Sequence, residues 1–351
     1  MIRNGNELDR CLQESLSFPT KLPGEIEGSK WLILGGTGFV GKWITLYGLE
    51  LWSRFKVGPE VVIASRDVAM AEKQLRSFLP PRFELPKVTS YHDILGRHAS
   101  ESNLNEVDTI FHSATPTHGH SGSIYEVLEI TKVLIEKCID LNAPKFIHLS
   151  SGGVYQRGDF KGRFVKEDTP RVESEQSVNA YQRVKVDLEK LVESAHKQGM
   201  IRGANPRLFA FAGPGFPLNQ EYAFADFVRL ALANKSIVIR GNPQTRRSYM
   251  HPLDMTQWIL QVWLNIDGIG LNPTHIGSSV PVSIFDLATQ IAQYFGSNDV
   301  QSLSSAYSEE EWYVPEAMRM RNLGCELEYS SIESILDSWS NFLSPQKSAW
   351  S

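Results

Sequence analysis

The clearest chemical signal in this 351-residue chain is a tyrosine followed four residues later by a lysine, Tyr181 and Lys185. Positions i and i+4 share one face of a helix, so the Lys185 ammonium is predicted to lie near the Tyr181 phenol. A neighbouring cation favours the phenolate and is expected to lower the tyrosine pKa from about 10 toward the working pH. Ser150 and Ser151 end a strand-like run, where a hydroxyl can hydrogen-bond the same substrate oxygen. Together these residues predict acid–base chemistry at a hydroxyl or carbonyl group.

A glycine-rich stretch supplies the second signal, at the junction of a strand-like run and a helical run. Its residues are Gly35, Gly36, Thr37, Gly38, Phe39, Val40 and Gly41. Glycines three residues apart let the chain turn tightly and bring backbone N–H groups close to a pyrophosphate. They also let the helix approach the strand. The stretch therefore predicts a dinucleotide-binding site.

The residues after the second strand-like run bear on which dinucleotide binds. NAD-preferring domains usually offer a carboxylate to the adenosine ribose at this point. Ser65 stands at the expected acidic position, and Arg66 can pair with a 2′-phosphate through charge-assisted hydrogen bonds. Asp67 comes one or two positions late but is still able to reach the ribose. NADP is therefore the favoured cofactor, and NAD stays the alternative.

These residues need a scaffold that brings them to one edge, and the hydrophobic pattern indicates one. Short β-rich runs predict strands at 31–34, 61–64, 107–112 and 145–149. Helical spacing occurs between them, at 43–51 and 124–141. Alternating strands and helices imply right-handed crossovers and a parallel sheet covered on both faces. The predicted fold class is α/β, a doubly wound parallel Rossmann sheet with a smaller C-terminal α/β substrate lobe.

With these elements in order, residues 30–345 resemble the extended short-chain dehydrogenase/reductase superfamily, in its NAD(P)-dependent nucleotide-sugar epimerase/dehydratase branch. The motifs follow one another in the order found in that family. They are the glycine stretch, the strand at 108–114, the turn that begins at Ser150 and Ser151 (the serine turn) and the tyrosine–lysine pair. Further matches are Arg207-Leu208-Phe209, Gly213-Pro214-Gly215 and Arg247-Ser248-Tyr249-Met250-His251. Several matches in one order are much harder to obtain by chance than any single motif.

The resemblance implies a role for each matching residue. Tyr181 is the implied proton donor or acceptor, Lys185 holds the phenolate and the nicotinamide ribose, and Ser151 orients the substrate oxygen. The implied cofactor contacts, beyond the glycine stretch and Ser65 and Arg66, are Asp93 and Ile94 at the adenine, with Ala114. The implied substrate contacts are Thr115, Ser150 and Arg247. Of these, Arg247 would bind the diphosphate as a bidentate cation.

The chain departs from the family pattern at positions that decide the reaction. In the family's 4,6-dehydratases an Asp and a Glu follow the catalytic hydroxyl and eliminate water, whereas Gly152 and Gly153 stand here. Glycines transfer no protons, so a self-contained 4,6-dehydratase is disfavoured. Ala210 replaces an Asn that often binds the diphosphate, and the region of a second phosphate-binding Arg reads Glu309-Glu310-Glu311-Trp312. The candidates to replace that arginine are Arg319 and Arg321.

Hydride transfer at a sugar carbon, C4 by preference, is the predicted reaction, either as epimerisation or as reduction of a 4-keto sugar. Oxidising an alcohol needs a base at O–H and a hydride acceptor at C–H, held in one geometry. Arg66 favours the reductase, and the segment around Arg247 favours the epimerase. The alternatives are a nucleotide-sugar dehydratase or decarboxylase of the same family and a cofactor-binding member without turnover.

The predicted division of the chain places the site in a cleft between two parts. The parts are an N-terminal extension at 1–29, a dinucleotide-binding domain at 30–205 plus 236–275, a substrate lobe at 206–235 plus 276–345, and a tail at 346–351. A polar, Ser-rich segment at 297–311 is expected to be a surface loop. Tyr222, Phe224 and Phe227 are expected on the core face of a helix, with a place in the substrate pocket as the alternative.

Composition restricts the partners and the location. Asp plus Glu number 40 against 35 Lys plus Arg, a formal charge of −5, so no strong basic field is available for a nucleic acid. The lack of a signal-like start and of a run of about 18 apolar residues predicts no membrane association. Three widely separated cysteines argue against disulfides and a thiolate metal site, so a cytoplasmic protein without a metal is expected. A homodimer through the helices at 124–141 and 178–195 is expected by analogy with relatives.

Overall fold

The computed structural model describes residues 22–95, 104, 106–114, 121–156, 160, 162–177, 179–219, 222–303 and 310–343. Three predictions fall outside these residues: Thr115 as a substrate contact, the tail at 346–351, and most of the N-terminal extension. Glu309 of the acidic run also lies outside them.

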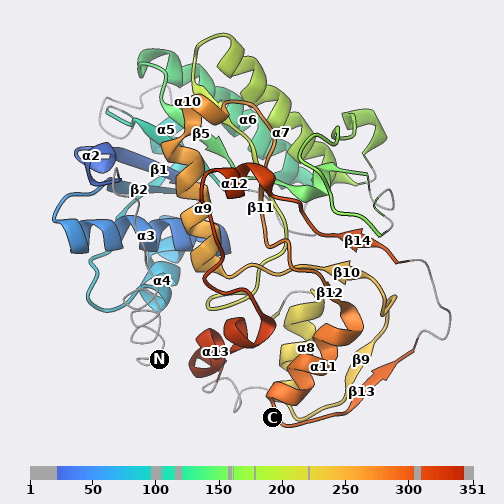
Figure 1. Cartoon of the computed structure of the whole chain (residues 1–351). Helices are drawn as coiled ribbons and strands as arrows, with labels where there is room; N and C mark the ends of the chain where they lie inside the picture. The colour runs from blue at the N-terminus through green and yellow to red at the C-terminus, as the bar shows by residue number, and fades with distance from the viewer. Residues whose placement is uncertain are drawn as a thin grey trace.

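A six-stranded parallel sheet forms the centre of the molecule (Figure 1). Its strands are β1 (Lys30–Leu34), β2 (Glu60–Ser65), β3 (Lys87–Ser90), β4 (Thr109–His112), β5 (Lys145–His148) and β7 (Arg202–Ala204). The strand order is β3-β2-β1-β4-β5-β7, so the direction of winding reverses between β1 and β4. In doubly wound sheets, ligands bind in the crevice outside the carboxyl ends of the strands at this reversal. The predicted α/β doubly wound class is confirmed.

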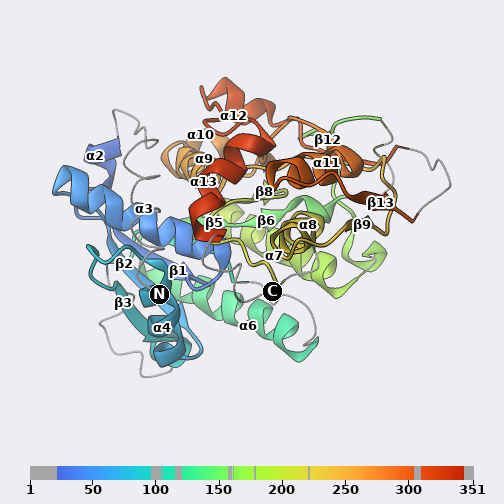
Figure 2. The same cartoon turned by 90° about the horizontal axis from the view of Figure 1, so that it is seen from below.

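Helices cover both faces of this sheet because successive strand side chains point to opposite faces. Trp31 and Ile33 pack in one apolar cluster with residues of α3 (Phe39–Phe55) and α9 (Pro252–Leu264). Leu32 and Leu34 pack in another with residues of α6 (Ser121–Lys137) and α7 (Ala180–Lys197). Figure 2 shows α9 and α6 on opposite sides of the sheet. The strands of β1 and β4 are therefore buried on both faces, which accounts for their continuous apolar sequence.

Shorter strands extend the fold beyond the central sheet. They are β6 (Ser150–Ser151), β8 (Pro206–Leu208), β9 (Ile237–Ile239), β10 (Arg246–Arg247), β11 (Thr274–Ile276), β12 (Val282–Ser283), β13 (Val300–Ser302) and β14 (Trp312–Tyr313). They form a β11-β8-β6 sheet, a β12-β10-β14 sheet and a β13-β9 pair. Three longer helices accompany them: α8 (Ala223–Leu232), α11 (Ile284–Tyr294) and α13 (Ile332–Leu343). Figure 1 shows α8, α11, β9 and β13 together at one end of the molecule.

Two of these elements bear on the predicted organisation. β13 forms inside the segment 297–311, so the prediction of a surface loop throughout was wrong at 300–302. Its backbone is paired with β9, a partner that its largely polar sequence does not reveal. β9 lies at the start of the predicted cofactor-domain segment 236–275, yet it pairs with β13 and not with the central sheet. The division into domains stays a prediction.

The remaining elements are short, apart from one helix. They are α2 (Leu22–Ile26), α4 (Val68–Phe78), α5 (Tyr91–Leu95), α10 (Ile266–Ile269), α12 (Met318–Asn322) and the 3-10 helices η1 (Cys138–Asp140), η2 (Gly152–Val154) and η3 (Ser174–Gln176). Within the described part of the chain, no helix has the length and apolarity needed to cross a bilayer.

Two histidines lie on adjacent strands at the centre of the sheet. His112 on β4 and His148 on β5 are fully buried, with their Nδ1 atoms 3.2 Å apart. His112 Nε2 lies 2.9 Å from Thr131 Oγ1 on α6. Burial lowers the pKa of His112 to about 3 and the pKa of His148 well below its ordinary value, and the charge of Lys185 lowers both further. Both rings are therefore uncharged at neutral pH.

The buried histidines predict a loss of stability in mild acid. Unfolding exposes the imidazoles, which take up protons below about pH 6.5, so stability falls as the pH drops from about 6.5 toward the lowered native pKa. One such histidine contributes a slope of about 1.4 kcal/mol per pH unit. In urea unfolding at pH 7, 6 and 5, we expect His148→Leu to lessen the slope between pH 6 and 5 by roughly that amount. An unchanged slope would show that the buried ring is already protonated.

Candidate active site

The tyrosine and the lysine of the predicted site lie one turn apart near the start of α7. Asn179 caps this helix, since its side chain accepts a hydrogen bond from Gln182 N at 2.9 Å. Tyr181, in the first turn, is 38% exposed, whereas Lys185 is 3% exposed. The helix thus presents the phenol to the surface of the crevice and directs the lysine into the protein.

The serine turn meets this helix at the carboxyl end of β5. Ser151 Oγ accepts a hydrogen bond from Gly153 N at 3.0 Å, which begins the 3-10 helix η2. Gln182 Nε2 donates to the carbonyl oxygens of Gly153 and Tyr155 at 2.9 and 3.1 Å. The Ser151 hydroxyl forms a hydrogen bond with the Tyr181 phenol. The structure therefore brings Ser151 and Tyr181 together, and an amide on α7 holds the turn in place.

The expected effect of Lys185 on Tyr181 is not found. The pKa of Tyr181 is raised. Partial removal of the phenol from water disfavours the phenolate more than the hydrogen bond with Ser151 favours it. Lys185 Nζ instead donates to the Leu149 carbonyl oxygen at 2.6 Å. Its ammonium is buried beside His112 and His148, and this burial lowers its pKa to about 7, although the charge of Glu189 acts in the opposite direction. The i, i+4 spacing correctly predicted that both side chains start from one face of the helix. The lysine ammonium, however, hydrogen-bonds the Leu149 carbonyl oxygen and not the phenol.

The glycine stretch is built for close backbone contact. An ideal Cβ on Gly35 would lie 2.7 Å from Ala114 N, and one on Gly41 would lie 2.2 Å from Gly35 O. Gly35 also has a φ of 79°, a left-handed conformation that favours glycine. α3 begins at Phe39 with Gly38 as its N-cap, and Gly38 has no side chain to bind the first free N–H groups. The loop thus leaves helix N–H groups facing the crevice, where an anionic group can bind.

Ser65 is the last residue of β2, and Arg66 and Asp67 follow it before α4 begins. The Ser65 side chain is partly exposed at the end of the strand, and the Arg66 side chain, one residue later, is exposed. The Asp67 carboxylate caps α4 by accepting from Met70 N at 2.9 Å, which gives it a structural role at this position. Burial raises the pKa of Tyr91, whereas the Arg66 charge and a hydrogen bond with the Gly35 backbone lower it. Tyr91 therefore lies beside the glycine loop.

Sequence reasoning missed Tyr91, although its place directly after β3 was a usable signal. Asp93 and Ile94, the predicted adenine contacts, follow it on α5. Asp93 is exposed, whereas Ile94 is 2% exposed and packs in the apolar cluster of Leu34 and Ala64. Ala114 lies against Gly35 at the reversal of the sheet.

Arg247 lies on β10, with β14 as its parallel neighbour. Its guanidinium carbon is 5.3 Å from the ring centroid of Tyr313, and Nη2 is 3.9 Å from Glu311 Oε1. Glu310 pairs with the adjacent Arg246. The acidic run is thus partly neutralised by these two arginines. Arg319, a candidate replacement for the missing arginine, binds the Pro273 carbonyl oxygen and lies 3.7 Å from Glu167, so it already has protein partners.

Two further tyrosines bear on the site from beyond the central sheet. An ideal Cβ on Gly152 would lie 2.6 Å from Tyr313 Oη and 2.8 Å from the Phe209 ring. Tyr313 thus fills the space beside the serine turn that a side chain at 152 would need. Tyr222 caps α8, is 46% exposed, and acts on the pKa of Tyr181. The expectation that Tyr222 lies in the core was wrong, because the buried face of α8 begins at Phe224.

Known proteins resemble this chain in sequence over most of its length. A model of the NAD dependent epimerase/dehydratase family matches residues 31–273. The chain is 26% identical over 276 residues to a dTDP-D-glucose 4,6-dehydratase of Dictyostelium discoideum, in a match that covers 75% of this chain and 61% of the relative. Across four curated relatives that it matches, the chain spans 44% to 61% of their length.

Solved structures share the fold. The UDP-glucuronic acid 4-epimerase from Bacillus cereus, in complex with UDP-glucuronic acid and NAD, is 21% identical with a TM-score of 0.72, covering 90% of this chain and 99% of that chain. The dTDP-glucose 4,6-dehydratase from Bacillus anthracis, in complex with NAD, is 17% identical with a TM-score of 0.72, covering 92% and 100%. At these identities the similarity shows the fold.

The contact between Gly152 and Tyr313 predicts a cost for any side chain at position 152. Gly152→Ala is expected to lower the free energy of unfolding by about 1–3 kcal/mol, because the added methyl overpacks the turn. Tyr313→Phe in the same chain removes the hydroxyl and should restore part of that loss. Gly241→Ala is the matched control, since nothing lies within 4 Å of a Cβ there. Urea unfolding of the four proteins checks this, and equal stability of the two alanine variants would contradict it.

Proposed function

The chain belongs to the NAD-dependent epimerase/dehydratase family, and on that premise we propose that it transfers a hydride between a nicotinamide dinucleotide and a nucleotide-sugar carbon. Its catalytic residues are Ser151, Tyr181 and Lys185. The observation that carries the proposal is the hydrogen bond between the Ser151 hydroxyl and the Tyr181 phenol. β1, β4 and β5 are adjacent and parallel, so this pair and the glycine loop are at the same edge of the sheet.

The residues at that edge suit the dinucleotide. Gly35 and Gly41 have no room for side chains, so a pyrophosphate can approach the backbone as closely as the N–H groups of α3 allow. When bound, the nicotinamide ring supplies the hydride acceptor or donor. Lys185 has its ammonium at the end of β5, where it would hold the nicotinamide ribose. The preference for NADP rests on Arg66, because Asp67 is occupied as a helix cap.

Acid–base chemistry at the sugar falls to the two hydroxyl groups. Ser151 donates a hydrogen bond to the oxygen on the reacting carbon, and Tyr181 removes a proton from that oxygen or returns one to it. The raised pKa of Tyr181 keeps the phenol protonated at neutral pH, which suits it to donate a proton to a keto oxygen. This protonation state supports reduction of a 4-keto sugar, while epimerisation at C4 uses the same residues in both directions.

A self-contained 4,6-dehydratase is less well supported, although relatives carry that name. Tyr313 and Phe209 occupy the space of a side chain at 152, where such an enzyme holds a carboxylate. Arg247 is the proposed diphosphate contact, since its ion pair with Glu311, at 3.9 Å, is too long for a direct hydrogen bond. Thr115 and Ser150 stay predicted substrate contacts, and the homodimer and the cytoplasmic location stay predictions.

The role of Tyr181 predicts a large and selective loss of turnover. Tyr181→Phe keeps the ring and removes the hydroxyl, so we expect turnover to fall by about a hundredfold or more, with dinucleotide affinity within about twofold. The assay follows NADPH consumption and product formation on UDP-, dTDP-, GDP- and CDP-sugars. Tyr294→Phe is the control, because its hydroxyl bonds Asp337 away from the crevice. Equal turnover of the Tyr181 variant contradicts the mechanism, and an inactive unmodified protein favours the non-catalytic alternative.

Arg66 predicts a cofactor preference. Arg66→Ala removes a charge-assisted hydrogen bond to a 2′-phosphate, so NADP affinity should fall by roughly tenfold to a hundredfold while NAD affinity changes little. Fluorescence titration with NADPH and NADH measures both. Arg76→Ala, an equal charge change in the last turn of α4, is the control. Equal effects on both dinucleotides would reverse the preference in favour of NAD.

A further inference from the structure

Glu189 extends the functional face of α7 by one more turn. Tyr181, Lys185 and Glu189 are spaced i, i+4 and i+8, so their side chains start from one face of the helix. Glu189 is fully buried, with 0% exposure. Burying a carboxylate costs several kcal/mol unless charged or hydrogen-bonding partners surround it, so Glu189 is expected to have such partners.

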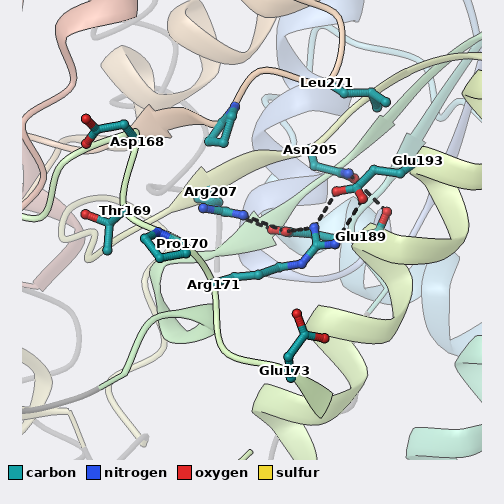
Figure 3. A pocket seen from close by; sticks show the side chains of 11 residues that line it. Asp168, Thr169, Pro170, Arg171, Glu173, Glu189, Glu193, Asn205, Arg207 and Leu271 are labelled. Atoms are coloured by element: carbon teal, nitrogen blue, oxygen red, sulfur yellow. Dashed lines mark hydrogen bonds and ion pairs between the residues drawn. The ribbon is translucent and has the colours of Figure 1, made fainter. Parts of the chain in front are cut away.

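Both oxygens of this carboxylate are occupied by partners from three different segments. Glu189 Oε1 accepts from Ser150 Oγ at 2.5 Å and from Arg207 Nε at 3.0 Å. Glu189 Oε2 accepts from Arg207 Nη2 and from Arg171 Nη1, each at 2.8 Å. Figure 3 shows Arg171 between Glu189 and Glu193, beside a cavity of about 290 Å³.

These contacts hold the serine turn at both ends. Ser150 precedes Ser151 on β6, and Ser150 is paired with Arg207 of β8 in the sheet register. Arg207 Nη1 also donates to Tyr155 Oη at 2.8 Å, just beyond η2. The Glu189 carboxylate therefore links α7, which carries Tyr181, to the strand that carries Ser151. A small displacement between such groups lowers catalysis strongly, because the reacting atoms must be aligned.

Charge provides a second link between Glu189 and the site. Burial raises the pKa of Glu189, but hydrogen bonds from Arg207, Ser150 and Arg171 outweigh it, so the group is anionic. Lys185 faces His112 from β4 and His148 from β5, both uncharged, and its ammonium is favoured by Glu189 from α7. Arg171 and Arg207 reduce the negative charge that Glu189 offers, while Glu193 pairs with Arg171.

We propose that Glu189 is a positioning residue of this site: it fixes the Ser150–Ser151 strand against α7 and supplies the countercharge to Lys185. The proposal rests on the proposed hydride transfer, since it assigns to Glu189 the geometry and charge that the reaction uses. Glu189 itself touches neither substrate nor cofactor in this role.

The test compares Glu189→Gln with Glu189→Asp and Glu193→Gln. Glu189→Gln keeps the shape and removes the charge, so we expect turnover to fall by about tenfold to a hundredfold. In a plot of turnover against pH, the decline on the alkaline side (the alkaline limb) should move to lower pH, because the Lys185 ammonium loses its countercharge. Glu189→Asp keeps the charge, so its alkaline limb should stay near that of the starting protein although turnover falls. Glu193→Gln loses bonds to Arg171 alone and should stay within about twofold of the starting protein.

Two further measurements keep the proposal open to refutation if the glutamine variant unfolds or if no sugar is turned over. Ser150→Ala retains the charged cluster and breaks the direct hydrogen bond between Glu189 and β6, and we expect turnover to fall by about fivefold or more; unchanged turnover overturns the positioning role. NMR titration of lysine labelled with 13C at Cε follows Lys185 without turnover. A lower midpoint in Glu189→Gln relative to Glu193→Gln supports the countercharge role. An unchanged midpoint overturns it, whatever the fate of the proposed activity.

Discussion

A buried ammonium group beneath the carboxyl end of β5 is the constraint on which the site depends. Lys185 is 3% exposed, and a charge without water is costly unless the protein supplies partners. Two features meet this need: the Leu149 carbonyl oxygen at 2.6 Å and the carboxylate of Glu189 one turn along α7. Each comes from a different element, so the sheet and the helix must keep their relative position for the lysine to stay charged.

Close packing against glycine is the second organising feature, and it accounts for the glycines at positions 35 and 152. Gly35 meets Ala114 where the sheet reverses direction, and Gly152 meets Tyr313 beside the serine turn. In both places a remote segment of the same polypeptide fills the space that a side chain would take. The consequence at Gly152 is chemical: the hydroxyls of Ser151, Tyr181 and Tyr313 gather there, and no carboxylate side chain has room at that position.

The position of Lys185 also limits what helical spacing can predict. Residues at i and i+4 start from one face of a helix, but the flexible four-carbon side chain of lysine lets its ammonium point in several directions. Here the Tyr181 phenol stays at the surface and bonds Ser151, while the ammonium reaches inward to the Leu149 carbonyl. Burial of the ammonium lowers the pKa of Lys185, whereas the pKa of Tyr181 is raised although the lysine starts from the same helix face. A shared helix face is thus compatible with separate hydrogen-bond partners.

The local features of this protein were determined by its sequence alone. The glycine turn between β1 and α3, the tyrosine–lysine face of α7 and the alternation of strands and helices follow from residue types and spacing within a few turns. Only the tertiary structure decided which distant groups meet. Lys185 bonds a carbonyl 36 residues earlier, Arg207 and Arg171 converge on Glu189, Tyr313 fills the space at Gly152, and a polar segment at 300–302 becomes a strand beside β9. Periodicity reports the face on which a side chain starts, whereas packing between remote segments decides what it touches and therefore which groups are charged.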